Sequence, residues 1–90
     1  MAVGLIFEGP GVTQAQYEQV LNEVAPGNQV IPGVLYHAAG PSENGFCVVE
    51  VWESQEVADQ FFQDKLKVAM QNAGITGQPR FFSVVNILKP

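Results

Sequence analysis

The sequence is poor in several residue types, and each shortage argues against a class of function. It has one cysteine and one histidine in 90 residues, so a disulfide within the chain is impossible and a zinc site within one chain is not expected. Four lysine and arginine residues stand against nine aspartate and glutamate residues, and the net charge is −5. Nucleic acids and anionic membrane surfaces bind cationic faces, so neither is an expected partner.

Two further absences indicate where the protein functions. No apolar run approaches the roughly 20 residues that span a bilayer. The first four residues, Met-Ala-Val-Gly, lack the charged start and the cleavage pattern of a secretory signal. Together with the single cysteine, these features predict a cytoplasmic protein.

The length predicts a single domain, residues 1–90, with limited stability of its own. A chain of this size buries only about 60–65% of the surface that its unfolded form exposes. Burial of further surface against a partner would therefore stabilise the fold.

Six segments have the residue patterns of strands and helices. The first helix is predicted to begin after Thr13, which can form a capping box with Gln16, and to end before Pro26. The second is predicted to begin after Ser54 and to end at Gly74, which suits a left-handed C-terminal cap. Four segments rich in β-branched and aromatic residues are predicted strands, namely 3–8, 34–39, 46–53 and 80–88.

The resulting order β-α-β-β-α-β predicts an α+β, ferredoxin-like fold with a four-stranded antiparallel sheet and both helices on one face. A strand with one face in water would alternate apolar and polar residues, but these strands are apolar on both faces. The third strand shows this best, with Phe46, Val48 and Trp52 on one face and Cys47, Val49 and Val51 on the other. An uncovered apolar face of this size is unusual on a monomer, so we expect a homodimer formed through the sheet faces.

Several segments carry a resemblance to a known family. Gly-Val-Leu-Tyr-His at 33–37, Gly-Phe-Cys-Val-Val-Glu-Val-Trp-Glu-Ser at 45–54 and the segment 66–74 are the most similar. With the order of elements, they resemble the antibiotic biosynthesis monooxygenase family of dimeric α+β barrels, and in it the branch that mostly lacks an assigned activity. The resemblance covers almost the whole chain and implies that fold.

The resemblance also implies a function. Active members of this family include cofactor-independent monooxygenases that oxidise polycyclic aromatic phenols to quinones. A similar activity here would be an oxidoreductase without a cofactor, acting on a small aromatic substrate of the phenol or quinone type. The alternative is a non-catalytic dimer of the same fold that binds a small molecule.

Haem degradation, another activity of this barrel, is less consistent with the residues present. Trp52 matches the tryptophan that recurs at the end of the third strand in the monooxygenase and haem-degrading members. The haem-degrading members pair it with an asparagine on the first strand and a histidine on the second helix. This sequence has Phe7 and Glu8 on the first strand and no histidine on the second helix.

Two residues are the candidate catalytic groups. His37 can titrate near neutral pH and is the natural general base; the alternative is a histidine that only makes hydrogen bonds at the barrel rim. Glu50 lies two residues before Trp52 and so on the same strand face, where a desolvated carboxylate could accept a proton. The alternative for Glu50 is a structural partner for Arg80 or a hydrogen bond across a dimer interface.

The candidate ligand-binding groups are aromatic or amide side chains. Asn86 could bind a substrate carbonyl or could hydrogen-bond to backbone at the strand end. A phenolic donor could come from Tyr36 or, alternatively, Tyr17. Cys47 is expected to be a small buried hydrophobe, because no basic residue nearby would lower its pKa. The full set of substrate-binding candidates is Trp52, Asn86, Tyr36, Phe62 and Phe82.

Overall fold

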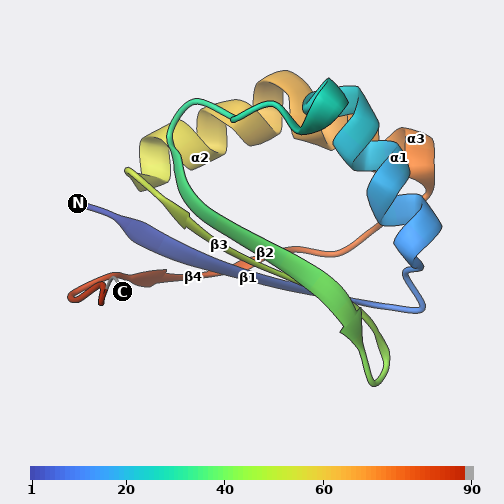
Figure 1. The fold of residues 1–90 in the computed structure, drawn as a ribbon, viewed down its shortest axis with the longest axis horizontal. Coiled ribbons are helices and arrows are strands. Elements are labelled where there is room, and N and C mark those ends of the chain that lie inside the picture. Colours follow the sequence, from blue (N-terminus) through green and yellow to red (C-terminus); the bar gives the residue numbers. More distant parts are fainter. Residues whose placement is uncertain (89–90) are drawn as a thin grey trace.

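The computed structural model describes residues 1–88 and confirms the predicted order of elements. One antiparallel sheet has the strand order β2-β3-β1-β4. Helix α1 and the segment formed by α2, η2 and α3 lie on one face of this sheet, and no described element covers the other face (Figure 1). The fold is ferredoxin-like. Its elements are β1 (Val3–Pro10), α1 (Gln14–Val24), η1 (Pro26–Asn28), β2 (Val34–Ser42), β3 (Gly45–Trp52), α2 (Gln55–Phe61), η2 (Phe62–Leu66), α3 (Lys67–Ala73) and β4 (Arg80–Ser83).

Both long helical segments begin at the predicted caps. The hydroxyl of Thr13 accepts the backbone N–H of Gln16 at 3.2 Å, and the Gln16 amide oxygen accepts the Thr13 N–H at 2.9 Å. The hydroxyl of Ser54 accepts the N–H of Val57 at 3.2 Å. These bonds satisfy backbone N–H groups that a helix start otherwise leaves without partners.

The second helical segment ends as predicted at Gly74. Gly74 has a φ of +73°, and its N–H donates to the carbonyl of Gln71. The N–H of Ile75 donates to the carbonyl of Met70 at 2.9 Å. This pair of bonds is the Schellman ending. Between its ends the segment contains one π turn, η2, where a wider turn interrupts the α-helical pattern.

The strands differ from the predicted ones at two places. The β2–β3 hairpin is longer than expected, and only Glu43 and Asn44 separate the strands, because Pro41 lies on an edge strand that tolerates a missing N–H. The predicted strand 80–88 is wrong beyond Ser83. Its neighbour β1 begins at Val3, which pairs with Ser83, so the chain after Val84 has no strand to pair with.

The face of the sheet without helices carries apolar side chains. Tyr36 is 58% exposed, Phe82 49% and Val49 37%. The ring of Phe82 lies over Gly4, where an added Cβ would come within 2.1 Å of ring atoms. We call this surface the outer face. Among residues 1–88, no helix is long and apolar enough to cross a membrane.

Candidate functional site

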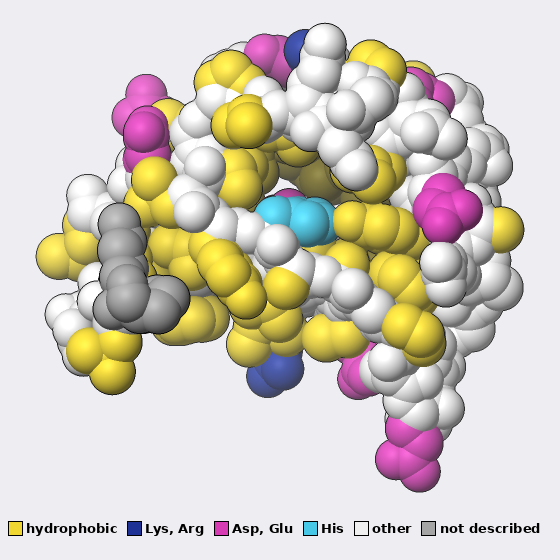
Figure 2. Space-filling model, viewed as in Figure 1, with side chains coloured by type: hydrophobic (Ala, Val, Ile, Leu, Met, Phe, Trp, Pro, Cys, Tyr) yellow, Lys and Arg dark blue, Asp and Glu magenta, His cyan; other side chains and the backbone are white. Residues whose placement is uncertain are grey.

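A cavity of about 310 Å³ lies between the sheet and the helices. Its lining is mostly apolar and includes residues from both hydrophobic clusters of the core. Figure 2 shows a hollow in the surface, with the only histidine, His37, at its edge. The aromatic side chains on its walls, besides His37, are Phe7, Tyr17, Phe46, Trp52, Phe61, Phe62 and Phe81.

A bulge in β2 places His37 on the cavity side. Val34 pairs with Trp52, but Tyr36 pairs with Val51, so one extra residue, Leu35, is accommodated between them. His37 therefore lies opposite Glu50. Without the extra residue, strict alternation from Val34 would direct Tyr36 into the cavity and His37 to the outer face.

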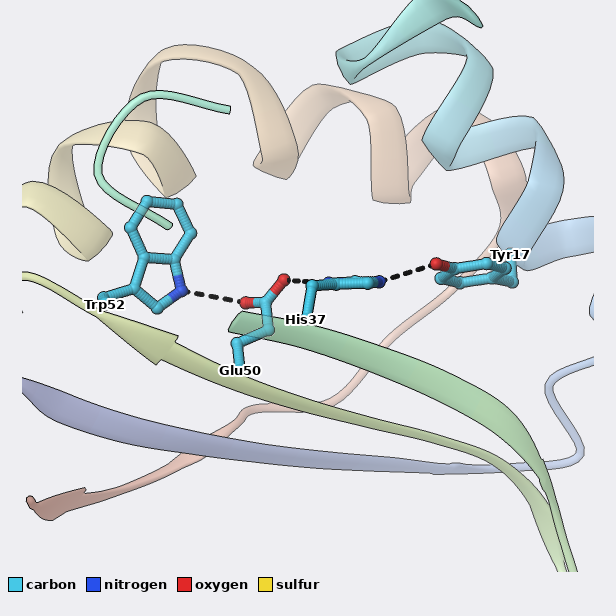
Figure 3. Close-up of polar contacts among 4 residues, drawn as sticks. All are labelled: Tyr17, His37, Glu50 and Trp52. Atoms are coloured by element: carbon cyan, nitrogen blue, oxygen red, sulfur yellow. Dashed lines mark hydrogen bonds and ion pairs between the residues drawn. The ribbon is translucent and has the colours of Figure 1, made fainter. Parts of the chain in front are cut away.

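Four polar side chains form a continuous chain of hydrogen bonds along one wall (Figure 3). The indole N–H of Trp52 donates to Oε1 of Glu50 at 2.9 Å. Oε2 of Glu50 lies 2.6 Å from Nδ1 of His37, and Nε2 of His37 lies 2.6 Å from the hydroxyl of Tyr17. We call these four residues the relay. They come from α1, β2 and β3.

The chemistry of the groups assigns the protons along the relay. Trp52 can only donate, so one oxygen of Glu50 must accept. With Glu50 as a carboxylate, Nδ1 of His37 carries the proton and donates to the second oxygen. With the imidazole in its neutral form, Nε2 is an acceptor, and Tyr17 donates its hydroxyl proton to it. Every member has a partner in this arrangement, including Glu50, which is only 9% exposed.

Tyr17 is held against other rings. Its ring stacks with Phe46 at a centroid distance of 4.9 Å and with His37 at 6.0 Å. Burial, and second the negative charge of Glu50, raise the pKa of the Tyr17 phenol above its usual value of about 10. Near neutral pH, Tyr17 is therefore a neutral hydroxyl that can pass a proton, not a phenolate.

The structure brings four of the seven predicted site residues to the cavity. His37, Glu50, Trp52 and Phe62 line it. The interpretation of Glu50 as a partner of Arg80 is wrong, since its hydrogen bonds go to His37 and Trp52.

The other three predicted ligand-binding residues lie elsewhere. Tyr36 faces the outer side because of the bulge at Leu35. Phe82 lies opposite Gly4 on the outer face, whereas its neighbour Phe81 lines the cavity. Asn86 is exposed in the segment that follows β4. None of the three lines this cavity, so their expected role in binding a ligand there does not fit their positions.

Two further assignments need revision. Tyr17 was only an alternative to Tyr36, although its place in the apolar stripe of the first helix was a signal that it faces the sheet. Cys47 is not fully buried; it lies on the outer face, opposite Glu8 and Gly40. The described residues contain no group of three or more side chains suited to hold a metal ion.

Comparison with known proteins identifies solved structures with a similar fold. No family model matches the sequence, and no curated protein is similar enough to match. A crystal structure from Chloroflexus aurantiacus, provisionally assigned as an antibiotic biosynthesis monooxygenase, has a TM-score of 0.69, 17% identity, and covers 99% of this chain and 98% of its own. A protein from Deinococcus radiodurans with the same provisional assignment has a TM-score of 0.65, 11% identity, and covers 100% of this chain and 98% of its own.

A monooxygenase from Streptomyces coelicolor in complex with nanaomycin D matches more loosely. Its TM-score is 0.48 at 21% identity, and it covers 99% of this chain and 90% of its own. The fold of this chain is the one that the two more similar structures share, as the sequence resemblance implied. At these identities the likeness establishes the fold, and the function is argued from the site.

Proposed function

We propose that the protein is a cofactor-independent monooxygenase that oxidises a small aromatic phenol to a quinone in this cavity. The observation that carries the proposal is the relay on the wall of an aromatic cavity. A phenolic substrate becomes reactive toward dioxygen when it loses a proton. The relay offers a base for that proton at the edge of a mostly apolar space.

The proposed reaction assigns roles to His37, Glu50 and Trp52 of the relay. His37 accepts the substrate proton, and Glu50 stabilises the imidazolium that forms. Trp52 orients Glu50 by occupying its other oxygen. The ring carbon para to the ionised hydroxyl then reacts with dioxygen, so that the phenol C–OH, its para C–H and O₂ become two C=O groups and H₂O.

The charge of the cavity favours a neutral ligand. Among the described residues that line it, the acidic side chains are Glu50 and Asp59, and there is no lysine or arginine. Carboxylate or phosphate groups would lack a cationic partner and would be repelled. A neutral phenol with an apolar ring system matches both the walls and the charge.

We further propose that the partner is a second copy of the chain. Support comes from the outer face, which carries Tyr36, Val49 and Phe82 in exposed positions and has no described element over it. A two-fold dimer would bury both copies of this face at once. The expected location remains the cytoplasm.

The alternative function is binding without catalysis. One observation favours it: the members of the relay already hydrogen-bond to one another. Such a network could serve only to place polar groups in an apolar wall.

Oxygen consumption with 1,8-dihydroxyanthrone tests the oxidation. We expect oxygen uptake above the rate in buffer, and a loss of about 100-fold or more in His37→Ala, as is typical when a general base is removed. Tyr36→Phe is a matched control on the same strand and should retain the wild-type rate, because Tyr36 faces away from the cavity.

Two outcomes would contradict this reading. Quenching of Trp52 fluorescence by the anthrone without any oxygen uptake would favour the binding protein; Trp52 is the only tryptophan and lines the cavity. Full turnover in His37→Ala would remove His37 from the mechanism.

A further inference from the structure

The relay has free hydrogen-bonding capacity at one place in particular. Both ring nitrogens of His37 are engaged, by Glu50 and by Tyr17. Each oxygen of Glu50 already accepts one donor, and Glu50 is only 9% exposed, so its remaining lone pairs are less accessible than those of Tyr17, which is partly exposed. The only N–H of the Trp52 indole is used. The Tyr17 oxygen donates its one proton to His37 but can still accept, and Tyr17 lines the cavity.

We propose that Tyr17, and not His37, is the residue that contacts the ligand, and that the site selects ligands with an O–H donor over ether or carbonyl analogues that can only accept. This inference rests on the proposed function and specifies its substrate class. In the resting relay, the Tyr17 oxygen offers lone pairs and no free proton. A phenol completes that hydrogen bond, whereas an acceptor-only ring places its oxygen against another acceptor.

The same geometry defines how the ligand loses its proton. The O–H bond of the ligand breaks and its proton passes to the Tyr17 oxygen, while the proton of Tyr17 passes to Nε2 of His37. The products are a ligand phenolate, a neutral Tyr17 and a His37 imidazolium paired with the Glu50 carboxylate. Charge and protons balance, and Tyr17 ends the step as it began.

Glu50 determines which group donates in each hydrogen bond of the relay, so a substitution at Glu50 provides a second test of the inference. In Glu50→Gln, the amide oxygen must still accept from Trp52, so the amide NH₂ faces Nδ1 of His37. His37 then carries its proton on Nε2 and donates to the Tyr17 oxygen. The hydroxyl proton of Tyr17 becomes free to point at the ligand. The preference of the site should therefore change from donors to acceptors.

Calorimetric titration with a matched pair of ligands tests the inference without any turnover. The probes are 2-naphthol, which donates, and 2-methoxynaphthalene, which only accepts, both measured in the same buffer at one pH. We expect the ratio of their affinities to fall about fivefold to tenfold in Tyr17→Phe, the effect of losing one hydrogen bond. It should fall further in Glu50→Gln, and should stay at the wild-type value in Tyr36→Phe.

The outcomes separate this inference from the oxidation itself. An unchanged ratio in Tyr17→Phe, or no binding of either probe to the wild-type protein, overturns the assignment of Tyr17. If Glu50→Gln does not fold, the comparison of Tyr17→Phe with Tyr36→Phe still tests whether Tyr17 contacts the ligand. A preference for 2-naphthol over 2-methoxynaphthalene without any oxygen uptake would contradict the proposed oxidation and leave the assignment of Tyr17 standing. Oxygen uptake at the full rate in Tyr17→Phe would overturn the assignment of Tyr17 and leave the proposed oxidation standing.

Discussion

Glu50 is the residue whose surroundings determine the chemistry of the site. A carboxylate that is 9% exposed would be costly as an ion if it were alone, by several kcal/mol. Two donors, Trp52 and His37, offset that cost, and a hydrogen bond to a charged group contributes about 1.5–3 kcal/mol. The indole of Trp52, which is 2% exposed, therefore has a polar function as well as a packing one.

The raised pKa of Tyr17 predicts a pH dependence. Because the folded state holds the Tyr17 proton more tightly than the unfolded chain does, its contribution to stability is complete below pH of about 10 and is lost as the pH rises through the higher folded value. Absorbance of phenolate, followed during alkaline titration, should show one tyrosine that ionises above the usual range.

The variant Tyr17→Phe assigns that ionisation. The late step should disappear, and the decline of stability above pH of about 10 should become shallower. Tyr36→Phe should retain the late step. Loss of the late step in Tyr36→Phe instead would contradict the placement of Tyr17 against Glu50.

At the scale of single elements, the bulge at Leu35 determines which residue of β2 enters the site. Alternation along a strand gives every second residue the same face, and one extra residue reverses that assignment for all residues after it. His37, and not Tyr36, enters the cavity for this reason. The π turn η2 contributes Phe62 and Leu66 to the opposite wall.

The end of the second helical segment provides a stability prediction. Gly74→Ala should lower the free energy of unfolding by about 1 kcal/mol, because φ is +73° and a Cβ disfavours that conformation. For a chain of this length, the change corresponds to a fall in the thermal midpoint of about 4–8 °C. Calorimetric unfolding measures it.

The matched control is Gly40→Ala on β2. Its backbone has no positive φ, and nothing lies within 4 Å of the added Cβ. The midpoint should stay the same or rise slightly. An equal loss in both variants would show that the strained φ is not the cause.

At the scale of the whole molecule, the dominant feature is a sheet with two apolar faces and helices on only one (Figure 1). The inner face closes around the cavity. The outer face has Val49 at its centre, paired with Ile6 on β1 and Ala38 on β2. A second copy of the same face is the partner that the proposed dimer requires.

Sedimentation velocity at micromolar concentration tests that assembly. We expect a dimer for the wild-type protein. Its dissociation constant should be at least about tenfold lower than that of Val49→Lys, because that change buries an unpaired charge in the interface. Val68→Lys is the matched control. Val68 is 52% exposed on α3, on the other side of the molecule from the outer face, and its replacement should leave the dimer intact. A folded wild-type monomer would contradict the proposal.

The sequence by itself determined the order of elements, both helix starts, the ending at Gly74 and the shared face of Glu50 and Trp52. All of these depend on interactions within a few residues or on the two-residue period of a strand. The tertiary structure alone decided the rest. The bulge at Leu35 reverses the face of His37, and β4 stops at Ser83 because its neighbour β1 begins at Val3.

The relay is the clearest feature that only the tertiary structure decided. Tyr17 and His37 are 20 residues apart and meet only because α1 packs across the sheet beside β2. No local pattern specifies the distance between a helix and a strand, since that distance depends on the side chains that fill the space between them. The candidate base was therefore visible in the sequence, while the hydroxyl that we expect to contact the ligand became evident only in the folded chain.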